Sequence, residues 1–127
     1  MPQHNFEELE IWKRSSRLAV SVLELIEKVR LYALRDQMAG SSISVPSNIA
    51  EGAERDSNRE FRRFLSIALG SCGELRTQLY LAQRSNCLVA EECSPLIQEA
   101  RELSAMINAF RRKLGPSWPT TLFSWLF

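Results

Sequence analysis

Residues 57–84, SNREFRRFLSIALGSCGELRTQLYLAQR, decide the fold of this chain. Apolar or small side chains recur in this stretch every three or four positions, which is the spacing of one face of an α-helix. Ser57 or Asn58 can cap the helix, and Glu60 follows Ser57 at the interval of a capping box. We therefore predict a helix that ends near Arg84, with a buried seam formed by Phe61, Leu65, Ala68, Cys72, Leu75, Leu79 and Ala82 and widened by Phe64 and Ile67.

Three further segments have the same periodicity: about 7–28, about 34–54, and from Glu91 or Ser94 to about Leu114. Four amphipathic helices with short connections predict an all-α fold, an antiparallel up-down-up-down four-helix bundle. The predicted buried faces are Leu9, Trp12, Ser16, Ala19, Leu23 and Ile26 in the first segment, Leu34, Met38, Ser41, Val45, Ile49 and Gly52 in the second, and Leu96, Ala100, Leu103, Ile107, Phe110 and Leu114 in the last.

Two prolines lie within these predicted helices. Pro46 removes one backbone hydrogen bond and clashes with the carbonyl four residues earlier, at a cost of about 3 kcal/mol or more. The second helix must therefore either kink at Pro46 or stop and restart there. Pro95 is expected in the first turn of the last helix, where its missing amide hydrogen does no harm.

Small residues are concentrated in 39–53 and again at Gly70 and Gly73. Each glycine inside a helix costs about 1 kcal/mol relative to alanine. Such a cost suggests that small residues are needed there for close helix contact. A lone bundle does not obviously need so much of this surface, so we predict a homo-oligomer.

Two segments carry a family resemblance: 42–55, SISVPSNIAEGAER, and 60–75, EFRRFLSIALGSCGEL. They resemble the SIPxNIAEG and EFxxFLxIAxGSxxEL signatures of the 23S rRNA intervening-sequence family, which includes the accessory variability determinant of diversity-generating retroelements. The resemblance extends from about Phe6 to about Leu114. It implies a four-helix bundle that assembles into a ring, with a homopentamer as the expected form. Because the family keeps this proline within its second helix, we predict a kink at Pro46.

Length and composition limit the possible classes. A chain of 127 residues with 45% hydrophobic content predicts one domain, residues 1–115, followed by a tail, residues 116–127. The formal net charge is +1, so electrostatic binding requires a local patch. No signal peptide is recognisable, and no segment has the roughly 20 apolar residues that span a bilayer, so we expect a cytoplasmic protein.

The tail is apolar and has no charged side chain. It is too short to span a membrane and too apolar to stay exposed to water. It docks either on its own bundle or a neighbouring subunit, or else it anchors the protein to a membrane surface or a partner. The residues concerned are Trp118, Leu122, Phe123, Trp125, Leu126 and Phe127.

Metal, cofactor and catalytic chemistry are not expected. Cys72, Cys87 and Cys93 match no CxxC or Cys/His spacing, and His4 is the single histidine. Neither a zinc site nor a histidine-based triad can be built from these residues, and di-iron bundles need Glu-x-x-His pairs that are missing here. We predict reduced thiols, no cofactor and no enzymatic activity.

Arginines form the strongest charge feature. They are Arg55, Arg59, Arg62 and Arg63 at the junction of the second and third helices, with Arg76 and Arg84 further along the third. Arginine forks suit phosphate contacts, so these six are the candidate nucleic-acid-binding residues. The alternative is that the arginines pair with the carboxylates among them, Glu51, Glu54, Asp56 and Glu60.

Other polar residues are assigned structural roles. Asn48, Glu51 and Glu74 are expected to hydrogen-bond to arginines or a helix terminus across the bundle. The run 111–113, Arg-Arg-Lys, is expected mainly to complement the dipole at a helix C-terminus, and a binding role is the alternative. A solvated face is expected to hold Lys13, Arg14 and Arg17, whose charges are balanced by Glu10 and Glu24.

Two functions are consistent with these features. The first is a nucleic-acid-associated scaffold whose repeated arginine patches bind structured RNA or an RNA–protein complex through avidity. The family resemblance adds a reverse-transcriptase-type partner to this hypothesis. The second is a protein-interaction or structural oligomer without a nucleic-acid role. Arginines free on an exposed rim favour the first hypothesis, and arginines bound to neighbouring carboxylates favour the second.

Overall fold

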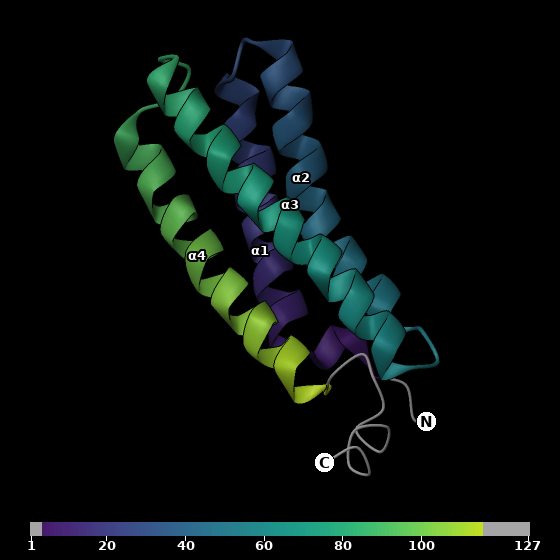
Figure 1. Ribbon diagram of the computed structural model, residues 1–127. Helices are drawn as coiled ribbons and strands as arrows, with labels where there is room; N and C mark the ends of the chain where they lie inside the picture. Colours follow the sequence, from purple (N-terminus) through teal and green to yellow (C-terminus); the bar gives the residue numbers. More distant parts are fainter. Residues whose placement is uncertain (1–3, 116–127) are drawn as a thin grey trace, which may run out of the picture.

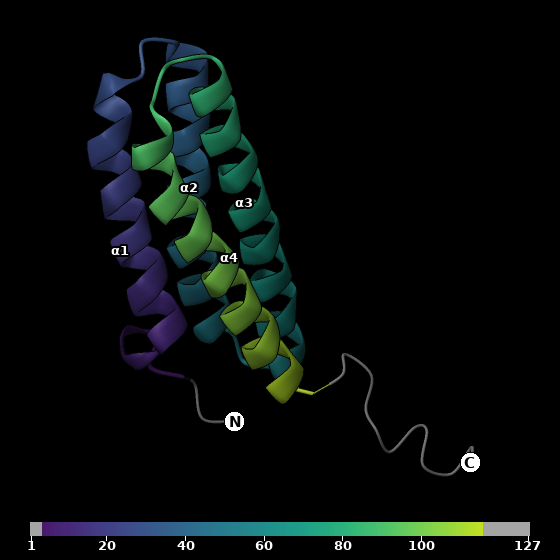
Figure 2. The same ribbon diagram turned by 90° about the vertical axis from the view of Figure 1, so that its left-hand side faces the viewer.

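The computed structural model describes residues 4–115, so the predicted tail lies outside the described residues. Figures 1 and 2 show a bundle in which each long helix runs opposite to the one before it. The all-α four-helix bundle predicted from the sequence is confirmed. Its elements are the 3₁₀ turns η1 (Phe6–Glu8) and η2 (Ile26–Lys28) and the helices α1 (Glu10–Leu25), α2 (Tyr32–Ala53), α3 (Asn58–Arg84) and α4 (Ala90–Lys113).

The predicted seam of α3 is confirmed along its whole length. Every residue from Phe61 to Ala82 on that seam is buried, as is Phe64, whereas Ile67 is 42% exposed and does not widen it. The side chains of α2 and α4 meet this seam from either side, with Met38, Ile49 and Leu103 fully enclosed. The helix α3 is thus the central packing element of the bundle.

The predicted face of α1 is wrong in its rotation. Ile11, Leu18 and Val22 form its buried stripe together with Ala19 and Ile26, whereas Leu23 is 37% exposed. Apolar residues cover more than half of the circumference of α1, so periodicity alone did not determine which face turns inward. Leu9 and Trp12 still pack at the edge of the core.

Both prolines lie inside continuous helices. The helix α2 runs unbroken through Pro46, so the alternative that it stops and restarts is not observed, and the kink stays a prediction. The helix α4 begins earlier than expected, at Ala90, because Glu92 accepts a hydrogen bond from the Val89 backbone at 3.2 Å and caps the first turn. Pro95 is therefore the sixth helical residue and lies in the second turn, not in the first.

Ion pairs join α1 and η2 to α4. The Arg14 Nε atom donates to Glu99 at 2.9 Å, and Glu102 lies 3.4 Å from the same guanidinium. Arg14 is thus turned into the α1–α4 interface, contrary to the predicted solvated face, because its partners belong to another helix. Arg17 does pair with Glu10 on the surface, at 3.7 Å. Lys28 pairs with Glu92 where α4 begins.

Candidate nucleic-acid interface

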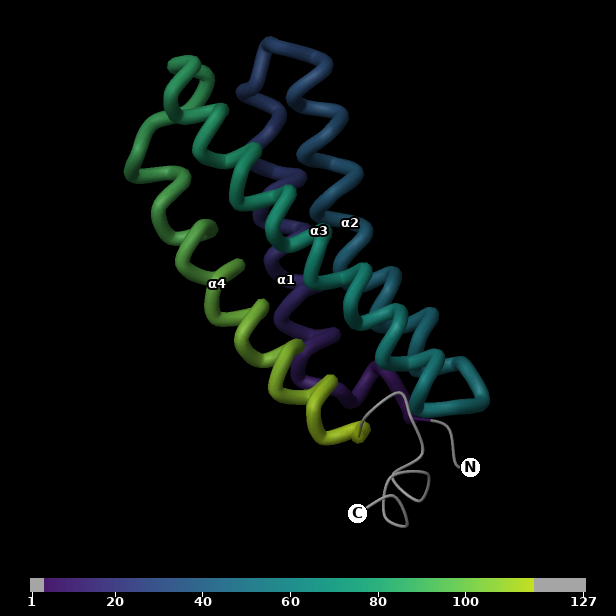
Figure 3. Tube along the Cα trace, in the orientation of Figure 1, coloured from purple at the N-terminus to yellow at the C-terminus, as the bar shows by residue number. Residues whose placement is uncertain are grey.

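The candidate interface surrounds the first turns of α3, at the end of the bundle where α2 is joined to α3 and α4 ends (Figure 3). The Ser57 hydroxyl caps α3 by accepting a hydrogen bond from the Glu60 backbone at 3.2 Å, as the sequence predicted. The cap fixes where α3 begins. It thereby sets Arg59, Arg62 and Arg63 three and four positions apart on the outer side of the helix.

Two of the predicted arginines are paired with carboxylates three or four residues earlier in the chain. Arg55 donates to Glu51 at 2.7 Å, and the Arg63 Nε atom donates to Glu60 at 3.0 Å. Both guanidinium carbons also lie over the Phe64 ring, 5.0 Å and 4.7 Å from its centroid. Arg63 holds the pKa of the Glu60 carboxyl below its ordinary value through that hydrogen bond. Phe64 therefore serves as a platform that keeps the two cations close together.

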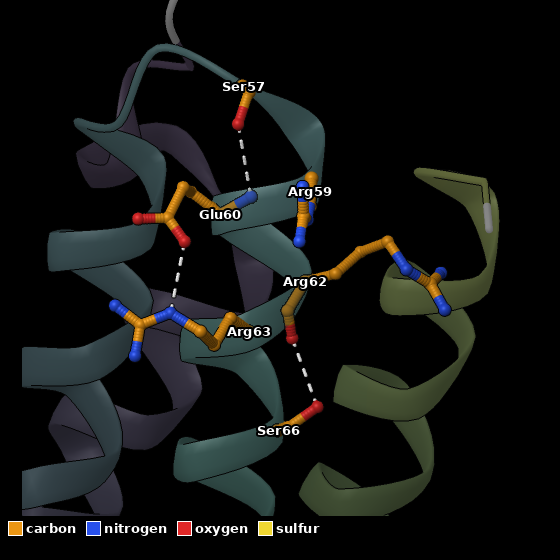
Figure 4. A pocket seen from close by; sticks show the side chains of 6 residues that line it. All are labelled: Ser57, Arg59, Glu60, Arg62, Arg63 and Ser66. Carbon is orange, nitrogen blue, oxygen red and sulfur yellow. Dashed lines mark hydrogen bonds and ion pairs between the residues drawn. The ribbon is translucent and has the colours of Figure 1, made fainter. Parts of the chain in front are cut away.

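Arg59 and Arg62 behave differently. Arg59 is exposed and forms no ion pair or hydrogen bond within residues 4–115. Arg62 extends toward α4, away from Glu60 and Arg63, and donates to the Arg111 carbonyl oxygen at 2.6 Å (Figure 4). An open hollow of about 490 Å³ lies among these side chains, lined by Ser57, Arg59, Glu60, Arg62, Arg63 and Ser66. Three cations and one carboxylate give this hollow a positive charge.

Arg76 and Arg84 lie away from this cluster. Arg84 is in the last turn of α3, 25 residues after Arg59, and a rise of about 1.5 Å per residue separates them by nearly the length of the helix. Arg76 is half-buried, and its Nε atom is buried without a hydrogen-bond partner among the described residues. The structure thus brings together four of the six predicted arginines. A role in binding for Arg76 and Arg84 stays a prediction.

The three predicted structural polar residues make local contacts or none. Asn48 donates to the Ser44 carbonyl at 2.8 Å and to its hydroxyl at 2.9 Å, and that hydroxyl lies 2.7 Å from the hydroxyl of Ser71 on α3. Asn48 thus supports a polar contact between α2 and α3. Glu51 pairs with Arg55, which follows the end of α2. Glu74 is exposed and lines a hollow between α2 and α3.

Sequence reasoning missed the residues that α4 contributes to this end of the bundle. Arg111 donates to the Ser66 hydroxyl at 2.9 Å and to the side-chain amide oxygen of Asn108 at 2.8 Å. The antiparallel topology was the signal that could have found them, because it places the last turn of α4 beside the first turns of α3. The sequence assigns Arg111 mainly to a run that complements the helix dipole, with binding as the alternative, and does not place it beside Arg62.

No metal or membrane-spanning feature is found in the part of the chain that the structure describes. Residues 4–115 hold no group of three histidine, cysteine or acidic side chains suited to a metal ion. None of the described helices is long and apolar enough to cross a membrane. The three cysteines are free, and burial raises the pKa of Cys72 and Cys93.

Comparisons with known proteins identify a family and a solved structure of similar fold. A family model described as 23S rRNA-intervening sequence protein matches residues 7–109. The fold resembles that of a protein with unknown function from the S23 ribosomal protein family of Bacteroides thetaiotaomicron VPI-5482, with a TM-score of 0.75. The two chains are 22% identical, and the alignment covers 80% of this chain and 98% of the other. No curated protein matches this chain.

Proposed function

Because this chain belongs to the family of 23S rRNA-intervening sequence proteins, we propose that it is a non-enzymatic helical scaffold that binds structured RNA, alone or in a protein complex. The binding surface is an arginine rim, defined as Arg55, Arg59, Arg62 and Arg63. The observation that carries the proposal is the hollow at the start of α3, whose lining includes Arg59, Arg62 and Arg63 and a single carboxylate.

The contacts within the arginine rim suit phosphate rather than base recognition. Arg59 forms no hydrogen bond or ion pair within residues 4–115, so its N–H donors are available to a ligand. Stacking on Phe64 holds Arg55 and Arg63 in place while leaving guanidinium edges exposed. Contacts of this kind position a nucleic acid without reading its sequence. The rim should therefore bind RNA by shape and charge.

Assembly into an oligomer is part of the same proposal. One copy with a net charge of +1 has little attraction for RNA, whereas several arginine rims on one ring give avidity without any new kind of contact. We propose a cyclic homo-oligomer, with a pentamer as the expected form. A Cβ atom added to Gly40, Gly70 or Gly73 would meet no atom of residues 4–115 within 4 Å, so these helix faces are open to a partner. A reverse-transcriptase-type protein is one partner that such a scaffold would serve.

A gel shift on structured RNA at low and moderate salt tests the nucleic-acid role. Wild-type protein should bind at low salt and lose affinity steeply as salt rises, because each neutralised phosphate releases counterions. The double variant Arg59→Glu with Arg63→Glu should lose binding while circular dichroism shows an intact bundle. Lys13→Glu with Arg17→Glu makes the same charge change on α1 and should retain most of the binding. Absence of wild-type binding at low salt would contradict the proposal.

A second candidate function is a protein-interaction oligomer. The observation that favours it is the pairing of Arg55 with Glu51 and of Arg63 with Glu60, which occupies two of the four rim cations. Equal RNA binding by the folded Arg59→Glu/Arg63→Glu variant, or no binding by wild-type protein, would favour this function. A protein partner would then use the open faces of α2 and α3.

A further inference from the structure

Two arginine side chains cross between α3 and α4 in opposite directions. Arg62 of α3 donates to the backbone carbonyl of Arg111 at 2.6 Å, and Arg111 of α4 donates to the Ser66 hydroxyl at 2.9 Å. The Ser66 hydroxyl in turn donates to the Arg62 carbonyl at 3.1 Å. These three contacts form a closed polar circuit between the two helices, and Arg62 and Ser66 also line the hollow of the arginine rim.

The crossing leaves positive charge and hydrogen-bond donors uncompensated. A guanidinium has five N–H donors. Arg62 uses one of them within the described chain, and Arg111 uses two, of which the second goes to Asn108. Neither arginine forms an ion pair within residues 4–115, and the Nε atoms of both are buried without a partner. A buried donor without a partner is destabilising, because it has lost its hydrogen bonds to water.

All protein acceptors at the crossing are neutral: two backbone carbonyls, one hydroxyl and one amide oxygen. The nearby carboxylate, Glu60, is bonded to Arg63 and lies on the opposite side of α3 from the extended Arg62 side chain (Figure 4). The charge here is therefore not neutralised by the protein itself. An external anion with several acceptor oxygens would supply what the protein lacks.

We propose that Arg62, Ser66 and Arg111 form a seat for one phosphate group between α3 and α4, with Arg59 at its open side. This inference deepens the proposed function and rests on it, since it names the phosphate of an RNA chain as the group held at one point of the arginine rim. Two guanidinium groups supplied by different helices match a tetrahedral phosphate better than a planar carboxylate, which one guanidinium already satisfies. The bound phosphate draws both guanidinium groups toward itself and ties the two helices together.

The position of Arg111 gives the proposal a matched control. Arg111 is half-buried between the helices, whereas its neighbour Arg112 is exposed in the same last turn of α4. Arg111→Gln and Arg112→Gln therefore remove the same charge at adjacent positions in the last turn of α4. Only the first removes a fork from the seat.

The first experiment uses inorganic phosphate as the probe. The melting temperature of the full chain is measured with increasing phosphate at constant ionic strength, with chloride as the compensating anion. Wild-type protein and Arg112→Gln should gain stability as the logarithm of phosphate concentration rises, and Arg111→Gln should not. Equal stabilisation of all three proteins, or of none, would overturn the seat. If Arg111→Gln does not fold, Ser66→Ala and Arg62→Lys are measured instead and should lose the phosphate effect.

The second experiment identifies the source of the phosphate. Binding of one RNA hairpin is compared with and without a 5′-phosphate, as a function of salt. A backbone phosphate in the seat predicts equal affinities for the two hairpins and a salt slope lower by about one in Arg111→Gln but not in Arg112→Gln. A terminal phosphate predicts tighter binding of the phosphorylated hairpin that depends on Arg111. RNA affinity and salt slopes that are the same in both glutamine variants would overturn the seat while leaving the proposed function intact. Phosphate stabilisation that requires Arg111, without any RNA binding, would contradict the proposed function and leave the seat intact.

Discussion

Gly52 of α2 packs directly against Phe61 of α3, so that a Cβ atom on Gly52 would lie 2.8 Å from the Phe61 ring. It would also lie 2.8 Å from the Cβ atom of Phe64 and 3.3 Å from the Phe61 carbonyl oxygen, neither of which can move without the backbone. Gly52→Ala should therefore destabilise the protein by about 1–3 kcal/mol. Urea unfolding followed by circular dichroism, at one fixed protein concentration, measures this change.

Gly70 is the control for this prediction. An added Cβ atom there would meet nothing within 4 Å in the described chain. Gly70→Ala should raise the free energy of unfolding by about 1 kcal/mol, because alanine is the better helix former. A neutral or stabilising Gly52→Ala would show that α2 and α3 are not held as closely as the structure places them.

The two glycines also show which parts of the fold the sequence could predict. The periodicity of α3 identified its whole buried seam, because polar and charged residues leave only one apolar stripe on that helix. It could not orient α1, where a second apolar stripe includes Leu23, nor could it tell that Gly52 is packed while Gly70 is open. Those facts depend on which helix faces which, and a single helix does not encode that relationship.

Acid should weaken the contact between η2 and α4. The pKa of Glu92 lies below its ordinary value of 4.5, mainly because Lys28 donates a hydrogen bond to its carboxylate and secondly because the Val89 backbone donates another. A depressed folded pKa contributes stability that is present above the unfolded pKa and is lost as pH falls through the folded pKa. The free energy of unfolding should therefore fall below about pH 5, and it should fall less steeply in Glu92→Gln. Urea unfolding between pH 7 and about pH 3 measures both slopes.

Glu91→Gln provides the comparison for this acid transition, since Glu91 is exposed and forms no ion pair in the described part of the chain. Its pH profile should follow that of the wild type. If the free energy of unfolding of Glu92→Gln and of wild-type protein fell identically with pH, Glu92 would not account for the loss of stability in acid.

The contact between Arg14 and Glu99 should contribute more stability than any surface ion pair of α1. The side chains of Arg14 and Glu99 are 23% and 31% exposed. Removing the Arg14 cation would leave the two carboxylates that it binds, Glu99 and Glu102, without this positive charge. Arg14→Gln should lower the free energy of unfolding by about 1.5–3 kcal/mol. Arg17, 66% exposed and 3.7 Å from Glu10, is the matched control, and Arg17→Gln should change stability by no more than about 0.5 kcal/mol. Similar losses in the two variants would contradict an interior role for Arg14.

The candidate site was predictable to the extent that it lies in one stretch of sequence. Arg55, Arg59, Arg62 and Arg63 are neighbours in the chain, and the structure places them around one end of the bundle. Arg111 was not predictable in this way, because it is 49 residues from Arg62 and meets it only through the antiparallel packing of α3 and α4. The sequence also did not decide whether the arginines are exposed and free or paired with neighbouring carboxylates. The structure shows both cases: Arg55 and Arg63 form ion pairs, whereas Arg59 forms none within residues 4–115.

The last prediction concerns assembly. Gly73 lines an open hollow between α2 and α3 together with Leu34 and Leu81, and an added Cβ atom there meets no atom of the described chain within 4 Å. Gly73→Leu should therefore leave a single bundle folded, yet it should block a second copy that packs closely against this face. Light scattering at micromolar concentration should give an oligomer mass for wild-type protein and a smaller mass for Gly73→Leu, with unchanged helicity by circular dichroism. Gln98→Leu, which adds the same side chain to an exposed position on α4, should keep the wild-type mass. A monomer mass for wild-type protein would contradict the predicted homo-oligomer, and a wild-type mass for Gly73→Leu would move the interface to another face of the bundle.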